Sequence, residues 1–156
     1  MQLSQIISSD AVLPNMKATG KRQLLQELSS EAARVSGLDS QLIFETLLRR
    51  EKLGSTGLGQ GIAIPHGKFA ALDRVHGLFA RIATPVKFDS VDDRPVDLVF
   101  LLLAPESAGA DHLKALARIS RLLRDPEIVE KLRGTNKAEG LYSILTENST
   151  ISNHAA

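Results

Sequence analysis

Hydrophobic positions in the N-terminal third of the chain recur at the three- and four-residue intervals of amphipathic helices. One such pattern occupies residues 20–37 and stops at Gly37, a residue type that commonly follows the last turn of a helix. A second pattern runs over residues 39–54, where Asp39 is suited to cap the first turn and Gly54 to end the last. The pattern therefore predicts two helices joined by a short connection.

Three hydrophobic stretches in the middle of the chain have the pattern of β-strands. The "IAI" of residues 62–64 is a short strand candidate inside a glycine-rich segment. Residues 75–83 alternate around Phe79, which is typical of a strand. Residues 96–104, "VDLVFLLLA", are apolar on both faces, and this favours a strand at the centre of a sheet.

Helical patterns return after the strands and occupy residues 110–125, 126–133 and 137–148. Pro126 separates the first two, because proline starts a helix readily and cannot continue one. Helices before, between and after strands favour a layered α/β fold with a mixed sheet, whose strand order the pattern does not give. We expect one domain over residues 1–156, with a short flexible tail at about 149–156.

Composition narrows the functional classes. The chain has 156 residues, a net charge of +1, one tyrosine and no tryptophan, so neither a nucleic-acid footprint nor a base-stacking surface is expected. Cysteine is absent, which excludes disulfides and thiolate metal sites and fits a reducing compartment. No apolar run is long enough for a signal peptide or a membrane span, so we expect a cytoplasmic protein without direct membrane insertion.

His66 stands in the most closely specified part of the chain, "GQGIAIPHGK" at residues 59–68. The surrounding glycines permit positive φ and close approach of the backbone, while Pro65 fixes the residue before the histidine. Such a loop can present a side chain and several backbone N–H groups to an anion. The spacing fits neither a P-loop nor a dinucleotide-binding fingerprint. An unspecialised loop histidine is the alternative interpretation.

Arg50 lies inside the hydrophobic stripe predicted for the second helix, and Arg49 lies at its edge. That stripe consists of Leu42, Ile43, Thr46, Leu47 and Leu53. An inward guanidinium needs an anion to pair with. The alternative is that Arg50 points outward from the last turn or stabilises the C-terminus of the helix.

His112 shares the apolar arc of its helix with Leu116, Ile119 and Leu123, so we expect it to face inward near the helix N-terminus. A hydrogen-bonded core histidine is the alternative. His76 and His154 have no comparable context and are interpreted as solvated. Together, His66, Arg50 and His112 would form a site for a dianionic group, with one nucleophilic imidazole and two partners that donate or carry positive charge.

These residues carry a resemblance to a known family. The stretch "RREKLGSTGLGQGIAIPHGK" at 49–68 closely resembles the active-site signature of enzyme IIA domains of the mannitol/fructose class, in the phosphoenolpyruvate-dependent sugar phosphotransferase system. The stretch "VDLVFLLLAPESAGADHLKALARISRLLRD" resembles the downstream strand and helix of that family. The resemblance extends from about Leu3 to Glu147. It implies a three-layer α/β/α sandwich with a mixed central sheet.

The resemblance also implies roles for individual residues. His66 matches the phosphorylated histidine, and Arg50 and His112 match the arginine and second histidine that stabilise the phosphoryl group. The loop-shaping or binding positions are Ser55, Thr56, Gly59, Pro65 and Gly67. Gln60 stands where the family commonly has asparagine, a mild departure.

The implied chemistry is transfer of a phosphoryl group from a histidine-phosphorylated, HPr-like carrier protein to a neutral imidazole of His66. The phosphoryl group carries about −1.5 to −2 charges, which Arg50 can engage through charge-assisted hydrogen bonds. Neither a metal nor another cofactor is needed, because the phosphoryl group arrives already activated on histidine.

Two branches of the family remain open. The start of the chain looks more like the nitrogen-regulatory branch, in which phosphorylation regulates partners such as potassium-transport or sensor-kinase proteins. The alternative is a sugar-transport IIA component that passes phosphate to a IIB domain.

Two hypotheses from other classes compete with phosphotransfer. A hydrolase could use His66 and His112 as a metal pair, although the sequence shows no third ligand at metal-site spacing. A pure binding module could keep the loop and never modify the histidine.

Overall fold

The computed structural model describes the backbone of residues 2–155 and the side chains of residues 2–147. The helical elements are η1 (Leu3–Gln5), η2 (Ser9–Ala11), α1 (Lys21–Ser36), α2 (Ser40–Lys52), α3 (Gly109–Leu122), α4 (Pro126–Arg133) and α5 (Ala138–Ala155). The strands are β1 (Val12–Met16), β2 (Gly57–Gly59), β3 (Ile62–Ala63), β4 (His66–Phe69), β5 (His76–Val86) and β6 (Val96–Pro105).

The strands form one mixed sheet. Its order is β1-β5-β6-β3-β2, and β4 also pairs with β6, following β3 along the same edge of that strand. The pairs β1–β5, β3–β6 and β4–β6 are parallel, whereas β5–β6 and β2–β3 are antiparallel. The mixed sheet predicted from the order of elements is therefore confirmed.

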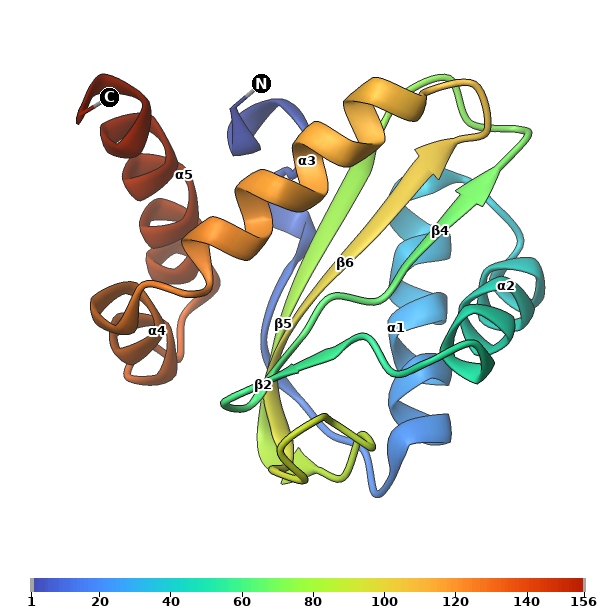
Figure 1. Cartoon of the computed structure of the whole chain (residues 1–156), viewed down its shortest axis with the longest axis horizontal. Coiled ribbons are helices and arrows are strands. Elements are labelled where there is room, and N and C mark those ends of the chain that lie inside the picture. The colour runs from blue at the N-terminus through green and yellow to red at the C-terminus, as the bar shows by residue number, and fades with distance from the viewer. Residues whose placement is uncertain (1, 156) are drawn as a thin grey trace.

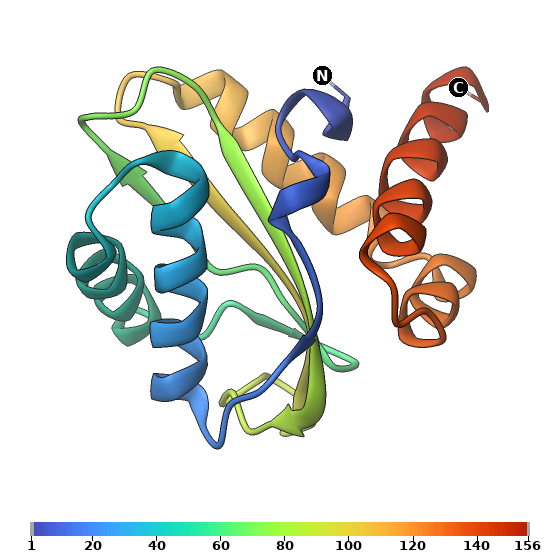
Figure 2. The same cartoon turned by 180° about the vertical axis from the view of Figure 1, so that it is seen from behind.

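Helices cover both faces of the sheet, as Figures 1 and 2 show from opposite sides. Helices α1 and α2 pack together on one face, with contacts to β5 and β4 respectively. Helices α3, α4 and α5 lie on the other, where α3 contacts β6 and α5 contacts β1. This is the three-layer α/β/α sandwich that the resemblance implied.

Strand β6 is the central element of the core. All of its residues are buried except Asp97, because helices cover both of its faces and strands flank both of its edges. The mostly apolar stretch at residues 96–104 predicted this position correctly. Burial of this strand fixes the backbone against which β4, and with it His66, is aligned.

The predicted helix boundaries agree with the structure to within three residues, except that the last helix, predicted to end at residue 148, extends in α5 to Ala155. Gly37 ends α1 with φ of 79°, a left-handed conformation that favours glycine, and the Asp39 side chain accepts a hydrogen bond from the Leu42 amide. Strand β1, which contains Pro14, is not among the predicted elements; it lies at the edge of the sheet, where a missing amide is tolerated.

The hydrophobic stripe predicted for α2 is wrong in its orientation. Leu42 and Leu53 are exposed, and the buried face of the helix consists of Ile43, Phe44, Leu47 and Glu51. The buried face is rotated relative to the predicted stripe because Phe44 packs inward. It also includes an acid, Glu51, which a pattern of hydrophobic residues does not reveal. Arg50 consequently lies at the border of the buried face, where it is half-buried.

The predicted flexible tail at 149–156 lies outside the residues whose side chains are described, so it stays a prediction.

Within the described residues, no helix has the length and apolar character needed to cross a membrane.

Candidate functional site

His66 is the first residue of β4, where it pairs in parallel register with Leu102 of β6. It was predicted to lie in a loop, but its backbone is held by the sheet, and the Leu102 amide donates to the Pro65 carbonyl at 3.0 Å. The imidazole Nδ1 lies 2.9 Å from the Ile64 carbonyl oxygen. Because a carbonyl can only accept, a neutral ring must carry its proton on Nδ1, and the lone pair is then on Nε2.

His112 faces His66 from the first turn of α3. The two ring centroids are 5.6 Å apart and the rings are inclined by 54°. His112 is 6% exposed, so the predicted inward orientation is confirmed. Its Nδ1 is buried and has no hydrogen-bond partner among the described residues. An unsatisfied buried nitrogen costs about 1–3 kcal/mol, a cost that a ligand atom could remove.

The environment of His112 favours its neutral form. Burial lowers its pKa below the usual 6.5, and electrostatic interactions with His66 and with the Lys68 ammonium lower it further. Lys68 follows His66 by two residues on β4, so both side chains project from the same face of the strand. Lys68 was not singled out from the sequence, although strand alternation through "HGK" could have placed it beside His66.

Arg50 lies in the last turn of α2, and its Nη1 donates to the Gly54 carbonyl at 2.9 Å. This bond satisfies a carbonyl just beyond the helix, as the alternative interpretation of Arg50 expected. Thr46, one turn earlier on α2, lies on the face of β4 opposite to the His66 side chain, since its Cγ2 would be 3.0 Å from a Cβ at Gly67. The structure thus brings His66 and His112 into direct ring contact, while contact between Arg50 and a phosphoryl group stays a prediction.

The turn of the β2–β3 hairpin has three successive residues with positive φ: Gly59 at 96°, Gln60 at 56° and Gly61 at 83°. Asp92 accepts from the Gln60 amide at 2.8 Å, and Arg133 donates to the Gln60 carbonyl. Gly59, predicted to shape the loop, therefore lies in a turn with left-handed backbone that side chains from two other segments hold in place, whereas Gly67 lies in β4.

The polar pair that opens the loop is engaged within the protein. The Ser55 hydroxyl donates to the Phe88 carbonyl at 2.9 Å. The Thr56 hydroxyl donates to the Glu51 carboxylate, which also accepts from the Thr56 amide at 3.0 Å. Both hydroxyl groups shape the loop in this structure. Glu51 was not predicted from the sequence, because no spacing rule distinguishes it from a solvated acid.

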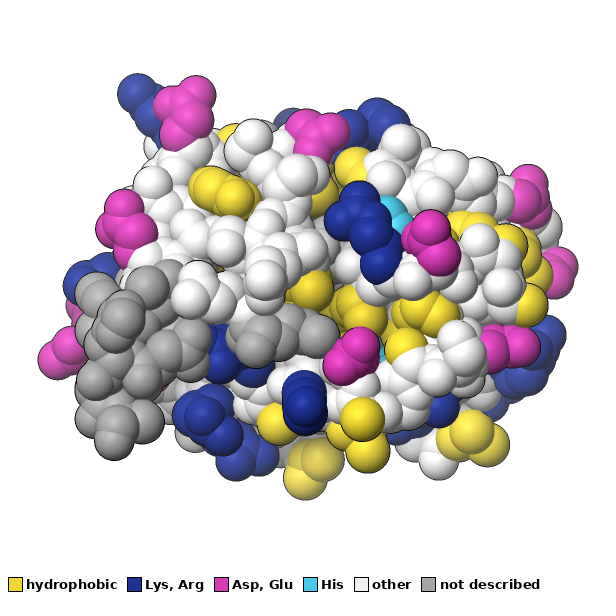
Figure 3. Space-filling view, turned by 90° about the horizontal axis from the view of Figure 1, so that it is seen from above, with side chains coloured by type: hydrophobic (Ala, Val, Ile, Leu, Met, Phe, Trp, Pro, Cys, Tyr) yellow, Lys and Arg dark blue, Asp and Glu magenta, His cyan; other side chains and the backbone are white. Residues whose placement is uncertain are grey.

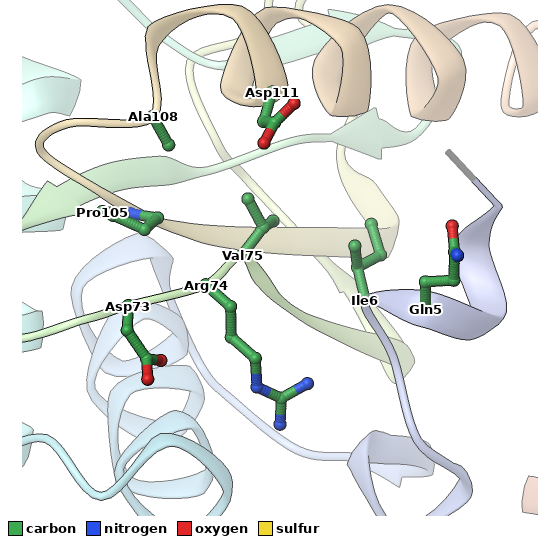
Figure 4. Close-up of a pocket in the computed structure, with 8 residues that line it drawn as sticks. All are labelled: Gln5, Ile6, Asp73, Arg74, Val75, Pro105, Ala108 and Asp111. Atoms are coloured by element: carbon green, nitrogen blue, oxygen red, sulfur yellow. The ribbon is translucent and has the colours of Figure 1, made fainter.

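The face of the molecule seen in Figure 3 is mixed in character. Histidine atoms reach the surface there beside cationic and acidic side chains, and hydrophobic side chains lie nearby. A separate cavity of about 310 Å³ opens near the start of α3 and is lined by Asp73, Arg74 and Asp111 among others (Figure 4). His66 does not line that cavity. Among the described side chains, no cluster of three or more histidine, aspartate or glutamate residues could hold a metal ion.

Comparison with known proteins places this geometry in context. The sequence model of a family described as "Phosphoenolpyruvate-dependent sugar phosphotransferase system, EIIA 2" matches residues 5–148. The chain is 54% identical over 145 residues to a nitrogen regulatory protein of Bradyrhizobium diazoefficiens, covering 93% of this chain and 95% of the relative.

Two more comparisons bear on the branch of the family. The crystal structure of nitrogen regulatory protein IIA-Ntr from Neisseria meningitidis superimposes with a TM-score of 0.88 at 40% identity, covering 92% of this chain and 99% of that one. A fructose-specific EIIA component of Haloferax volcanii is 37% identical over 134 residues, covering 86% of each chain. These two nitrogen regulatory proteins are thus more similar in sequence to this chain than this fructose-specific component is.

Proposed function

The chain belongs to the EIIA 2 family of the phosphoenolpyruvate-dependent sugar phosphotransferase system, and from this premise we propose that it is a phosphoryl-accepting regulator whose nucleophile is His66. Its phosphoryl donor would be a histidine-phosphorylated, HPr-like carrier protein. Its phosphorylation state would control partner proteins of nitrogen or potassium metabolism, such as a potassium transporter or a sensor kinase.

The observation that carries the proposal is the hydrogen bond between His66 Nδ1 and the Ile64 carbonyl, because it leaves Nε2 as the nucleophilic nitrogen. Nε2 would attack the phosphorus of the carrier's phosphohistidine. The new P–Nε2 bond forms as the old P–N bond breaks, and the carrier's imidazole leaves with the bonding electron pair. The His66 ring gains positive character during this step, and its Nδ1–H bond to Ile64 stabilises that charge.

The remaining site residues would stabilise the transferred group. The three equatorial oxygens carry most of the negative charge in such a transition state, so catalysis consists mainly of positioning and electrostatics. His112 has a buried Nδ1 without a partner, and with the proton of its neutral ring on that nitrogen it would donate a hydrogen bond to a phosphoryl oxygen. Lys68 adds positive charge on the same face, and Arg50 would turn from Gly54 to meet the phosphoryl group.

Two findings support the regulatory branch: the 54% identity to a nitrogen regulatory protein and the 0.88 TM-score to a IIA-Ntr structure. A sugar-transport IIA component would in addition pass its phosphate to a IIB domain. Transfer from the phosphorylated chain to an added fructose- or mannitol-type IIB domain would therefore favour the alternative.

The direct test is a reconstituted relay of phosphoenolpyruvate, enzyme I, a phosphocarrier and this protein, analysed by intact mass. We expect an acid-labile gain of one phosphoryl group in the wild type and none in His66→Ala. Unchanged mass in the wild type with every carrier would contradict the proposal and favour a binding module. Stoichiometric zinc in the purified protein, measured by plasma mass spectrometry, would instead favour the hydrolase hypothesis.

A further inference from the structure

Glu51 is a buried acid in the last turn of α2. Its side chain is 3% exposed, and one oxygen, Oε1, lies 3.0 Å from both Lys21 Nζ and the Thr56 amide nitrogen. The other oxygen, Oε2, accepts from the Thr56 hydroxyl. Lys21 Nζ in turn lies 4.6 Å from the centre of the Phe88 ring, so the ion pair packs against an aromatic side chain.

The position is unfavourable for an acid unless its partners are present. The C-terminal end of a helix carries partial negative charge, which opposes a carboxylate in the last turn. Burial adds a desolvation cost that only a complete set of donors offsets. Lys21, the Thr56 amide and the Thr56 hydroxyl together supply that set. Glu51 therefore fixes the position of Thr56 closely.

Thr56 connects this acid to the nucleophile through two backbone hydrogen bonds. The Ile64 amide donates to the Thr56 carbonyl at 3.1 Å. The Ile64 carbonyl then accepts from His66 Nδ1 at 2.9 Å. A displacement of Thr56 would thus move the Ile64 carbonyl, the group that selects which tautomer the His66 ring adopts.

We propose that Glu51 is a positioning residue for phosphoryl transfer, acting through Thr56 and Ile64 to hold the proton of His66 on Nδ1 and to present Nε2 to the phosphorus. This inference rests on the proposed function of His66. Glu51 does not touch the phosphoryl group; it determines which nitrogen is free and where that nitrogen lies.

The rest of the hairpin is held independently of Glu51. Asp92 and Arg133 hold its turn at Gln60, and Arg133 also pairs with Asp97 at 2.9 Å. Loss of Glu51 should therefore loosen the start of β2, next to Ile64, and leave the turn in place. This localised effect makes the role of Glu51 separable from general stability.

The test uses two matched pairs of variants in the full chain. Glu51→Gln removes the charge and one of its acceptor sites, and Glu45→Gln neutralises an exposed acid on the same helix. Thr56→Val removes the hydroxyl donor, and Thr56→Ser retains it. Circular dichroism checks folding, long-range ¹H–¹⁵N correlation spectra report the His66 tautomer, and carrier-dependent phosphorylation gives kcat and KM.

We expect Glu51→Gln and Thr56→Val to fold, to show mixed His66 tautomers, and to lose about 10- to 100-fold in kcat with little change in KM. Glu45→Gln should behave like the wild type, and Thr56→Ser should keep the single Nδ1–H tautomer of His66 because it retains the hydroxyl donor. A folded Glu51→Gln protein with one Nδ1–H tautomer overturns the proposal, whatever its rate. If Glu51→Gln does not fold, the contrast between Thr56→Val and Thr56→Ser decides the matter by the same criteria.

Failure of the proposed function would be seen differently. If the wild type accepts no phosphoryl group from any carrier, His66 is not the nucleophile proposed above. The tautomer spectra of the unphosphorylated variants would still show whether Glu51 controls the His66 ring.

Discussion

His66 and His112 are the same side chain in two environments, and the difference assigns their roles. The His66 ring is tied at Nδ1 to a carbonyl and half-exposed, so its other nitrogen can reach a partner protein. The His112 ring is buried beside it and has an unpartnered nitrogen, so an N–H there can donate a hydrogen bond to an oxygen of the transferred group. A nucleophile needs access, whereas a stabilising group benefits from exclusion of water.

The depressed pKa of His112 predicts a pH dependence of stability. Since burial and electrostatic interactions with His66 and Lys68 lower this pKa in the folded state, the unfolded chain binds the proton more readily. The free energy of unfolding should therefore decrease as the pH falls below about 6.5, the reference value for histidine. Urea denaturation at pH 7, 6 and 5 measures this decrease.

His112→Gln should reduce that decrease, because the group that resists protonation is gone. His76, whose pKa is also lowered, mainly by burial, should make a contribution of the same sign, and His76→Gln provides the comparison. An equal pH dependence in the wild type and in His112→Gln would contradict the assignment of a depressed pKa to His112.

Arg50 and its neighbour Arg49 offer a matched pair for the phosphoryl-stabilising role. Removing a charged donor that engages the transition state costs about 100- to 1000-fold in rate, so we expect a loss of this order in Arg50→Ala. Arg49 is exposed one position round the helix, and Arg49→Ala should phosphorylate at nearly the wild-type rate. Steady-state phosphorylation by the carrier measures both.

A near-normal rate in Arg50→Ala would mean that the bond to Gly54 is the whole function of Arg50. The thermal midpoints of the two variants separate the possibilities, since loss of that bond alone would lower stability without lowering the rate of the folded protein.

At the scale of elements, the sequence predicted those whose local pattern was complete. Helix α1, with its glycine stop, and strand β6, with its apolar run from Leu98 to Ala104, could both be assigned because the local hydrophobic patterns were clear. Strand β4 could not, since "HGKF" is four residues long and contains a glycine. Its strand character comes from pairing with β6, a long-range contact that no local pattern encodes.

The residues of the candidate site likewise fall into those that a local pattern identified and those that it did not. His66, Arg50 and His112 were identified because they interrupt a local pattern or match a family motif. Glu51 and Arg133 were missed because their partners lie in other segments: Lys21 for the first, and Asp97 and Gln60 for the second. The predicted orientation of α2 was wrong for a related reason, since a buried acid does not appear in a pattern of hydrophobic residues.

The hairpin turn gives a prediction at this scale. A Cβ at Gly61 would lie 2.4 Å from Arg133 Nη2 and 2.8 Å from Asp97 Oδ1, and its φ of 83° disfavours a side chain. Gly61→Ala should therefore lower the free energy of unfolding by about 2 kcal/mol, through backbone strain and displacement of the ion pair. Urea denaturation gives the value.

Gly109→Ala is the control, because nothing lies within 4 Å of its added Cβ at the start of α3. This variant should be unchanged or slightly more stable. Equal stability of the Gly61 and Gly109 variants would show that the turn tolerates a side chain.

At the scale of the whole molecule, phosphorylation lowers the net charge. The unmodified chain carries +1, and a phosphoryl group brings about −1.5 to −2. The isoelectric point of the modified form should therefore fall clearly below the sequence value of about 8.1. Native isoelectric focusing before and after incubation with the relay measures the shift, and His66→Ala should show none.

The pairing of His66 with β6 has a consequence for how partners read the modification. The residue that receives the phosphoryl group is fastened to the most protected strand of the molecule, so little backbone there is free to rearrange. The phosphorylated and unphosphorylated forms then differ mainly in the electrostatic potential at a surface whose shape stays nearly the same. A partner protein should therefore bind the two forms with clearly different affinities at low ionic strength. At high ionic strength this difference in affinity should shrink, because salt screens electrostatic potential but does not change shape complementarity.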